Sequence, residues 1–257
     1  MFNITFLIGM LLAGFAAQFI DGTLGMGYGV SSTSLLVAIG LAPAIASASV
    51  HTAEIVTTLV SGIAHHQFGN VKREIVLPLV IPGVIGGVLG AYFLSSIPGQ
   101  TIKPWMAGLL LVMGCLIVYR FFTRKEWGVA GKQLSRPRMT ILGLVAGFLD
   151  AVGGGGWGPV ATPSLILAEN SEPHEVVGSV NVVEFFVTLA ETITFALTIG
   201  LKAFRWDIVA ALLVGGVIAA PVAAWLSKRL PHRMMGILIG ALLILLNVRT
   251  LALTFVK

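Results

Sequence analysis

The sequence reads FIDGTLGMGYG at residues 19–29 and FLDAVGGGGWG at residues 148–158. The two stretches align without a gap at an offset of 129 residues, and each places an aspartate ahead of a group of glycines. Both lie inside long apolar regions, at residues 4–41 and 139–168. Glycine adopts backbone angles that end a helix. Each stretch therefore predicts a break between two short helices.

Further matched positions follow the glycine stretches in the same order. At offsets that rise from 129 to 133 they pair Thr33 with Thr162, Pro43 with Pro173, Ser49 with Ser179, His51 with Asn181, Glu54 with Glu184, Gly83 with Gly216 and Tyr92 with Trp225. Apolar composition alone seldom makes polar and glycine positions recur in order. We interpret the chain as two homologous membrane repeats, residues 1–120 and 139–257, joined by a linker at residues 121–138.

Composition places the chain in a lipid bilayer. Hydrophobic residues make up 56% of its 257 residues and charged residues only 11%, whereas soluble domains carry about 25% charged residues. The first Lys or Arg is Lys72, and a soluble protein without cations over so long an apolar stretch would aggregate. The net charge of +5 comes without a nucleic-acid-binding motif. The single Cys115 excludes an internal disulfide and a cysteine metal cluster.

The apolar runs have the length of membrane spans, because a bilayer core of about 30 Å needs about 20 apolar residues per helix. Uninterrupted runs are predicted as helices at residues 45–64, 75–94, 105–122, 176–199, 208–226 and 234–255. Together with the two glycine-broken regions they predict an all-α, polytopic integral membrane protein of 8 to 10 helical segments.

The linker predicts the orientation of the chain. It holds Arg124, Lys125, Lys132, Arg136 and Arg138 against the lone Glu126, so the positive-inside rule makes it cytoplasmic. If each broken region turned back as a hairpin, the halves would be inverted and both termini would lie outside. If each crossed once, the halves would be parallel and the N-terminus cytoplasmic. The distribution of Lys and Arg among the loops is compatible with both arrangements. The short apolar arms on either side of each break favour inverted halves, as in many secondary transporters.

The broken helices predict an anion site. Free N–H groups at a helix start, with the helix dipole behind them, bind anions without a cation. Broken segments at matching places in two halves are the best sequence indication of a transporter site. The candidate backbone contacts are Gly25, Gly27, Gly154 and Gly156. Tyr28 and Trp157, which are opposite each other in the alignment, are candidates for a pocket wall or gate.

Acidic side chains inside the apolar regions are a second group of candidates. They are Asp21, Glu54, Asp150, Glu184 and Glu191, of which the first four form two matched pairs. A charge in hydrocarbon costs about 2.5–3.5 kcal/mol on insertion scales, so such a group usually faces a cavity or a partner. A carboxyl group in a low-dielectric site can exchange protons near neutral pH. We expect the four matched acids to couple transport to protons or to brace the structure.

The element Ser49-x-His51-x-x-Glu54 adds polar donors to one helix. Residues three apart share a helix face, so His51 and Glu54 are predicted to form one hydrogen-bonded group, with Asn181 and Glu184 as its neutral-donor version. The candidate donors to a substrate are Ser49, His51, Ser179 and Asn181. One histidine three residues from a glutamate leaves too few ligands for a metal, and no nucleophile, base and orienting group come together. We therefore predict no metal, no cofactor and no enzyme activity.

These features together resemble the TauE/SafE family of sulfite-exporter-like membrane proteins, the toluene-sulfonate uptake permease group. The likeness rests on the two aspartate–glycine stretches and on the Ser49/His51/Glu54 and Ser179/Asn181/Glu184 elements, and it extends over essentially the whole chain. It implies secondary transport of sulfite or a small organosulfur anion such as sulfoacetate across the cytoplasmic membrane, driven by the proton gradient. In the first half His51 stands where the second half has Asn181.

Two other functions remain open from the residues alone. A passive anion channel would use the same site, and a cation carrier would use the intramembrane acids. The expected partners are a small anionic substrate and the lipid bilayer, with a homodimer left open and no nucleic acid. The expected location is the cytoplasmic (inner) membrane, with several passes through it.

Overall fold

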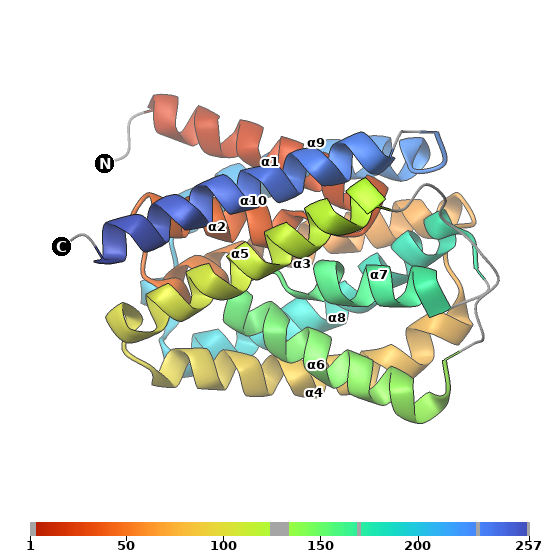
Figure 1. Cartoon of the computed structure of the whole chain (residues 1–257), viewed down its shortest axis with the longest axis horizontal. Helices are drawn as coiled ribbons and strands as arrows, with labels where there is room; N and C mark the ends of the chain where they lie inside the picture. Colours follow the sequence, from red (N-terminus) through yellow and green to blue (C-terminus); the bar gives the residue numbers. More distant parts are fainter. Residues whose placement is uncertain (1–3, 124–133, 169–170, 230–231, 256–257) are drawn as a thin grey trace.

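The computed structural model describes residues 4–123, 134–168, 171–229 and 232–255 (Figure 1). Within these ranges the chain is all helical. The helices are α1 (Ile4–Leu24), α2 (Tyr28–Ala38), α3 (Pro43–Gln67), α4 (Arg73–Ser96), α5 (Gly99–Thr123), α6 (Arg136–Gly153), α7 (Trp157–Ala168), α8 (Pro173–Thr198), the short 3-10 helix η1 (Leu201–Ala203), α9 (Trp206–Leu226) and α10 (His232–Phe255). The prediction of an all-α protein is confirmed.

Six helices in the described ranges are long and apolar enough to cross a membrane. They are α1, α4, α5, α8, α9 and residues Gly236–Thr254 of α10. The chain is therefore a polytopic membrane protein, as its composition predicts. Helix α3 also has the length of a span, with 25 residues, but Ser, His, Glu and Thr side chains interrupt its apolar sequence.

Helix boundaries follow local sequence rules. Helix α7 begins at Trp157, immediately after the glycines, as predicted. Helix α6 begins at Arg136, three residues before the predicted arm, because Pro137 fits the first turn of a helix. The predicted linker at residues 121–138 therefore overlaps the end of α5 and the start of α6. Residues 124–133 of that linker lie outside the described residues.

Each glycine-broken region folds back as a hairpin. In Figure 1, α1 starts at the left and α2 returns toward the left, whereas α6 starts at the right and α7 returns toward the right. The start of α1 and the end of α10 share the left end of the bundle, and the end of α5 and the start of α6 share the right end. Both breaks are buried, since every residue from 21 to 34 and from 150 to 158 is classed as buried.

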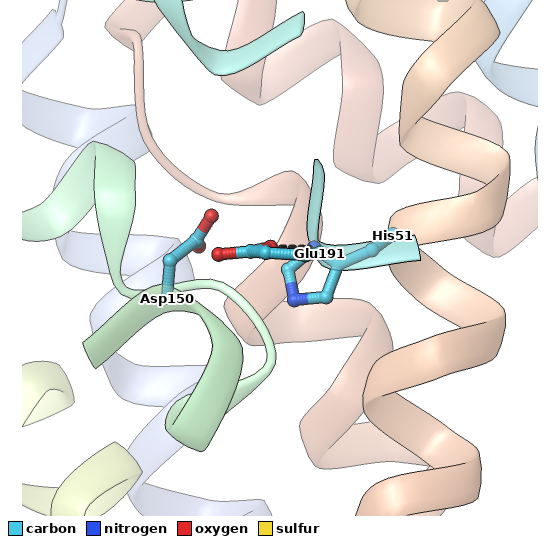
Figure 2. Close-up of side chains that lie close together, drawn as sticks. All are labelled: His51, Asp150 and Glu191. Atoms are coloured by element: carbon cyan, nitrogen blue, oxygen red, sulfur yellow. Dashed lines mark ion pairs between the residues drawn. The ribbon is translucent and has the colours of Figure 1, made fainter. Parts of the chain in front are cut away.

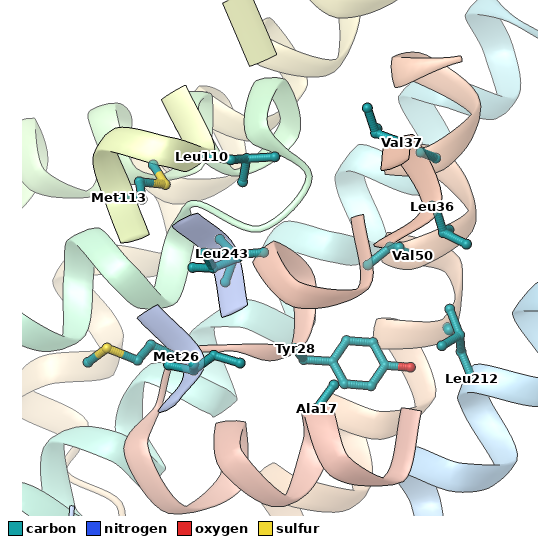
Figure 3. Close-up of a cluster of buried hydrophobic side chains, with 14 of the residues drawn as sticks. Ala17, Met26, Tyr28, Leu36, Val37, Val50, Leu110, Met113, Leu212 and Leu243 are labelled. Atoms are coloured by element: carbon teal, nitrogen blue, oxygen red, sulfur yellow. The ribbon is translucent and has the colours of Figure 1, made fainter. Parts of the chain in front are cut away.

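The two hairpins are held by helices from distant parts of the sequence. Helix α9 packs along α1, α4 packs along α6, and α3 and α8 pack against each other between them. Apolar side chains from α2, α3, α5, α9 and α10 surround the α1–α2 break, with Tyr28 and Met26 among them (Figure 3). A separate apolar cluster surrounds the α6–α7 break, with Trp157 and Leu165 among its members. This packing brings the two breaks to the middle of the protein.

Candidate functional site

Glycines form both breaks because the backbone there adopts conformations that other residues rarely reach. Gly25 and Gly154, which the alignment pairs, both have φ of +67°. The next positive φ angles are +144° at Gly27 and +146° at Gly155. The alignment pairs Gly27 with Gly156, whereas the second positive φ of the other break occurs at Gly155. The two breaks therefore have similar backbone angles, displaced by one residue. Positive φ values of this kind favour glycine over any residue with a Cβ.

The two breaks touch each other at the centre. A Cβ added at Gly155 would collide with the backbone of Gly29 and Val30. Two threonines link the breaks: Thr33 of α2 donates a hydrogen bond to the carbonyl oxygen of Gly154 (2.6 Å), and Thr162 of α7 donates one to the carbonyl oxygen of Gly25 (2.5 Å). The hairpin of one half is thus bonded to the hairpin of the other, through matched residues.

The aspartates face the helix starts. The backbone N–H of Trp157, at the first position of α7, donates to Asp150 Oδ1 over 2.9 Å, and the Asp21 carboxylate bonds the backbone N–H of Tyr28 in the same way. Both aspartates are at most 2% exposed. A carboxylate from the preceding helix therefore already occupies part of the positive end of each short helix. The sequence predicts that these aspartates brace the breaks, and it does not predict that they do so by bonding the first N–H group of the following helix.

The two aromatic residues after the breaks are packed against matched glycines. Trp157 and Tyr28 are at most 1% exposed. A Cβ at Gly83 of α4 would lie 2.9 Å from the Trp157 ring, and one at Gly216 of α9 would lie 3.3 Å from the Tyr28 ring. The Trp157 indole N–H also donates to the carbonyl oxygen of Val180 over 3.2 Å. The rings form walls of the buried centre.

A histidine and several acids meet between α3, α6 and α8 (Figure 2). His51 Nδ1 lies 2.7 Å from Glu54 Oε2, which confirms the predicted contact along α3. The same nitrogen lies 3.2 Å from Glu191 Oε2 of α8. Asp150 points toward Glu191 from the end of α6. Sequence reasoning noted Glu191 as a buried acid without an acidic partner and did not include it in the site.

This group is the one place in the described chain where ligand-type atoms gather. One atom each from His51, Asp150 and Glu191 lies within 4.8 Å of the others. His51 Nδ1 already serves Glu54 and Glu191, and a structural zinc site takes four ligands in tetrahedral geometry. We therefore interpret the group as a cluster of titratable side chains in close contact rather than as a metal centre.

Asn181 has different partners from those predicted. Its Oδ1 accepts a hydrogen bond from Ser61 of α3 (2.7 Å), and its Nδ2 donates to the carbonyl oxygen of Val177 (3.2 Å). The expected bond to Glu184 is not among the contacts of the described residues; Glu184 Oε2 is buried there without a partner.

The two matched serines, Ser49 of α3 and Ser179 of α8, each contact the start of another helix. The Ser49 hydroxyl accepts from the backbone N–H of Arg205 (3.2 Å), just before α9, and that of Ser179 accepts from Lys72 (2.8 Å), just before α4. Each serine thus ties its own helix to the first turn of a helix from the other half.

Comparison with known proteins identifies the family. The family model described as sulfite exporter TauE/SafE matches residues 10–250. The chain belongs to the TauE/SafE family. It is 47% identical over 247 residues, 95% of this chain and 82% of the relative, to the probable membrane transporter protein YtnM of Bacillus subtilis (strain 168). It is 28% identical over 172 residues, 66% of this chain and 69% of the relative, to the probable membrane transporter protein YdhB of the same organism. No solved structure gives a significant match.

The TauE/SafE family consists of membrane transporters, so this chain is a multi-pass membrane transporter and not an enzyme. The resemblance seen in its sequence is confirmed. In this TauE/SafE protein the buried centre is closed. A cavity of about 530 Å³ lies to one side of the α1–α2 break and is bordered by Met26, Arg120 and Pro163 among mostly apolar side chains. The acids and His51 are 0–4% exposed.

Proposed function

We propose that this protein is a secondary transporter that moves sulfite or a small organosulfur anion across the cytoplasmic membrane, with its substrate site between the two broken hairpins. The family name supports the substrate class. The observation that carries the location is the meeting of two helix starts, at Tyr28 and Trp157, in the buried centre. Helix starts are natural anion sites because their N–H groups and dipoles favour negative charge.

The proposal includes two inverted repeats, residues 1–120 and 139–257, with a cytoplasmic linker between them. Its support is that matched residues make matched contacts. Thr33 and Thr162 each bond the break of the other hairpin, and Ser49 and Ser179 each bond the start of a helix in the other half. The pairing of α1 with α9 corresponds to that of α6 with α4. The hairpin directions then place both ends of the chain on the outer side.

In this proposal the substrate contacts the backbone of the break glycines and the two aromatic rings beside them. Gly25, Gly27, Gly154 and Gly156 supply close backbone approach, because a glycine has no side chain to keep a substrate away. Tyr28 and Trp157 form the walls, and His51 and Asn181 lie on the two central helices as polar neighbours. Ser49 and Ser179 already serve helix starts, so we assign them to bracing rather than to the substrate.

Coupling to protons follows from the charge balance of the centre. Asp21, Asp150, Glu54 and Glu184 are buried and form no salt bridge with Lys or Arg in the described residues. Charged carboxylates would repel an anionic substrate, and burial makes each charge costly. Acids that carry protons remove both penalties. We therefore propose that protons accompany the anion, with these four acids as coupling or bracing groups.

Two experiments test the function. A thermal-shift screen of the purified protein against sulfite, sulfate, thiosulfate and sulfonates tests the substrate class, and we expect stabilisation by sulfite or a sulfonate. Proteoliposomes then separate a transporter from a channel: we expect counterflow and accumulation driven by a pH gradient, whereas a passive channel would give equilibration only. Glu184→Gln should alter the pH dependence of transport, and an unchanged rate and pH profile would remove Glu184 from the coupling role.

The buried acids favour one alternative function, a cation carrier. The same proteoliposomes separate it from an anion transporter. Competition by sulfite, without inhibition by metal ions, supports the anion. Inhibition by metal ions alone supports the cation carrier and contradicts our proposal.

A further inference from the structure

Several contacts at the centre occur twice, once in each half, with the same chemistry. Thr33 and Thr162 both donate to a break carbonyl. Ser49 and Ser179 both accept from a helix start. At these positions the two halves have the same neutral side chains, so these contacts create no difference in charge between the halves.

One of the matched contacts that differ between the halves joins α3 to α8. At the offset of 130 residues that pairs His51 with Asn181, Ser61 is paired with Glu191. Ser61 donates to Asn181 over 2.7 Å, and in the matched position His51 lies 3.2 Å from Glu191. The four residues lie on α3 and α8, so both contacts join the same two helices. We call these contacts the Ser61–Asn181 pair and the His51–Glu191 pair.

The two pairs differ in their capacity to change charge. Serine and asparagine stay neutral throughout the physiological range of pH, so the Ser61–Asn181 pair is a fixed hydrogen bond. Histidine and glutamate both gain and lose protons. His51 Nδ1 also lies 2.7 Å from Glu54, so a single nitrogen can hold a proton between two carboxylates on different helices. The two pairs thus occupy matched places in the packing of α3 against α8, but only the His51–Glu191 pair can gain or lose a proton.

The surroundings of Glu191 allow its carboxyl group to change charge. Its side chain is 0% exposed, and neither oxygen has a hydrogen bond of good geometry. The titratable groups that face it are His51 and Glu54 from α3 and Asp150 from α6, with Glu184 nearby on its own helix. On the α4 side it meets Gly87, where a Cβ would come within 2.7 Å of Oε1. Its proton is therefore controlled by its neighbours' charges and not by solvent.

We propose that the His51–Glu191 pair is the single carrier of the coupling proton, and that the Ser61–Asn181 pair is its fixed counterpart. Glu191 Oε2 takes up the proton, His51 Nδ1 shares it, and the proton leaves toward the opposite side when the anion does. This inference rests on the proposed function. It adds that the coupling proton is carried on one side of the centre, with one proton per transport cycle, by an acid whose matched residue in the other half is the neutral Ser61. Asp21, Asp150, Glu54 and Glu184 then brace the centre or, through their charges, set how readily the pair takes up its proton.

The test uses the full chain in proteoliposomes with labelled sulfoacetate, whose sulfonate and carboxylate both stay ionised between about pH 6 and 8. The membrane potential is clamped, and two quantities are measured: counterflow without a gradient, and the accumulation ratio under a gradient of one pH unit. One coupled proton gives about tenfold accumulation, because one pH unit equals the free energy of a tenfold concentration ratio. Two coupled protons would give about a hundredfold.

Glu191→Gln keeps the size of the side chain and removes its titration. We expect counterflow within about twofold of the unchanged protein and an accumulation ratio near one. His51→Asn, which copies the residue of the other half, should also give an accumulation ratio near one. Its counterflow carries no expectation of being unchanged, because His51 is a polar neighbour of the substrate in the proposed site. The matched control is Ser61→Ala, which removes the hydrogen bond of the fixed pair and should leave the accumulation ratio near ten. Size-exclusion elution and thermal midpoint verify that each variant is folded.

Five outcomes would overturn the proposal, four of them without a chelator and one with it. The first four are an accumulation ratio that survives Glu191→Gln, a ratio that Ser61→Ala abolishes equally, a ratio near a hundred in the unchanged protein, and loss of counterflow together with accumulation in folded Glu191→Gln, which would place Glu191 at the substrate. Accumulation that disappears with a chelator would assign the cluster to a metal ion instead, and also overturns it. If the unchanged protein transports no anion, the proposed function fails first, and that result is distinguishable from all of these.

Discussion

Gly155→Ala should be the most damaging single-methyl change in the centre of the protein. Gly155 has φ of +146°, and backbone conformations of this kind cost a residue with a Cβ about 1–3 kcal/mol. Its Cβ would also collide with the backbone of Gly29 and Val30. Overpacking costs about 1–3 kcal/mol. The two costs together are about 4 kcal/mol, a large part of the 5–15 kcal/mol that typically stabilises a folded protein.

Thermal unfolding in detergent measures this loss against two controls. For a chain of this length 1 kcal/mol lowers Tm by about 2–4 °C, so Gly155→Ala should lower it by about 8–16 °C. Gly200→Ala tests the backbone cost alone, because Gly200 has φ of +79° and no atom within 4 Å of an added Cβ; we expect a loss of about 1–3 kcal/mol. Gly108→Ala has neither problem, and should be neutral or slightly stabilising, since alanine favours a helix.

The order of the three midpoints tests the close contact between the hairpins. If Gly155→Ala melted within about 2 °C of Gly200→Ala, the collision with Gly29 and Val30 would not exist in the protein. The two breaks would then be separated, and the site between them would be larger than the structure shows.

Three further predictions address the bonds and the orientation of the hairpins. Thr33→Val and Thr162→Val should each cost about 1–3 kcal/mol, because each leaves a buried carbonyl oxygen without its donor; equal midpoints for variant and parent would contradict this. Asp150→Ala should cost about 0.5–2 kcal/mol through loss of the bond at the start of α7, and Asp150→Asn, which keeps an acceptor, should recover most of it. In a background without the native cysteine, Gln100→Cys should react with an impermeant thiol reagent from outside intact cells, and Gln67→Cys only after permeabilisation; the reverse pattern would refute the predicted orientation.

Much of the fold is predictable from the sequence because a bilayer makes span length and charge informative. The six uninterrupted apolar runs correspond to helices, and the start of α7 at Trp157 follows from the glycines before it. The sequence leaves the hairpin and the single crossing as alternatives for each broken region, because the distribution of Lys and Arg is compatible with both. The direction of the short arms in space decides it in the structure (Figure 1).

The site is less predictable, because its contacts join residues far apart in the chain. The contact between His51 and Glu54 follows from helix geometry, three residues along one face. No local pattern shows that Ser49 bonds the start of α9, 156 residues away, or that Glu191 reaches His51. The repeat itself offers one indication, because Ser61 and Glu191 occupy matched positions and differ in their capacity to carry charge.

The central claim is that the substrate lies between the two broken hairpins, and a structure of the protein in lipid nanodiscs with sulfite or sulfoacetate tests it most directly. We predict density for one anion between the starts of α2 and α7, close to Gly25, Gly27, Gly154 and Gly156. Density confined to the apolar cavity beside Met26 and Arg120, or to the surface of the helix bundle, would contradict the account.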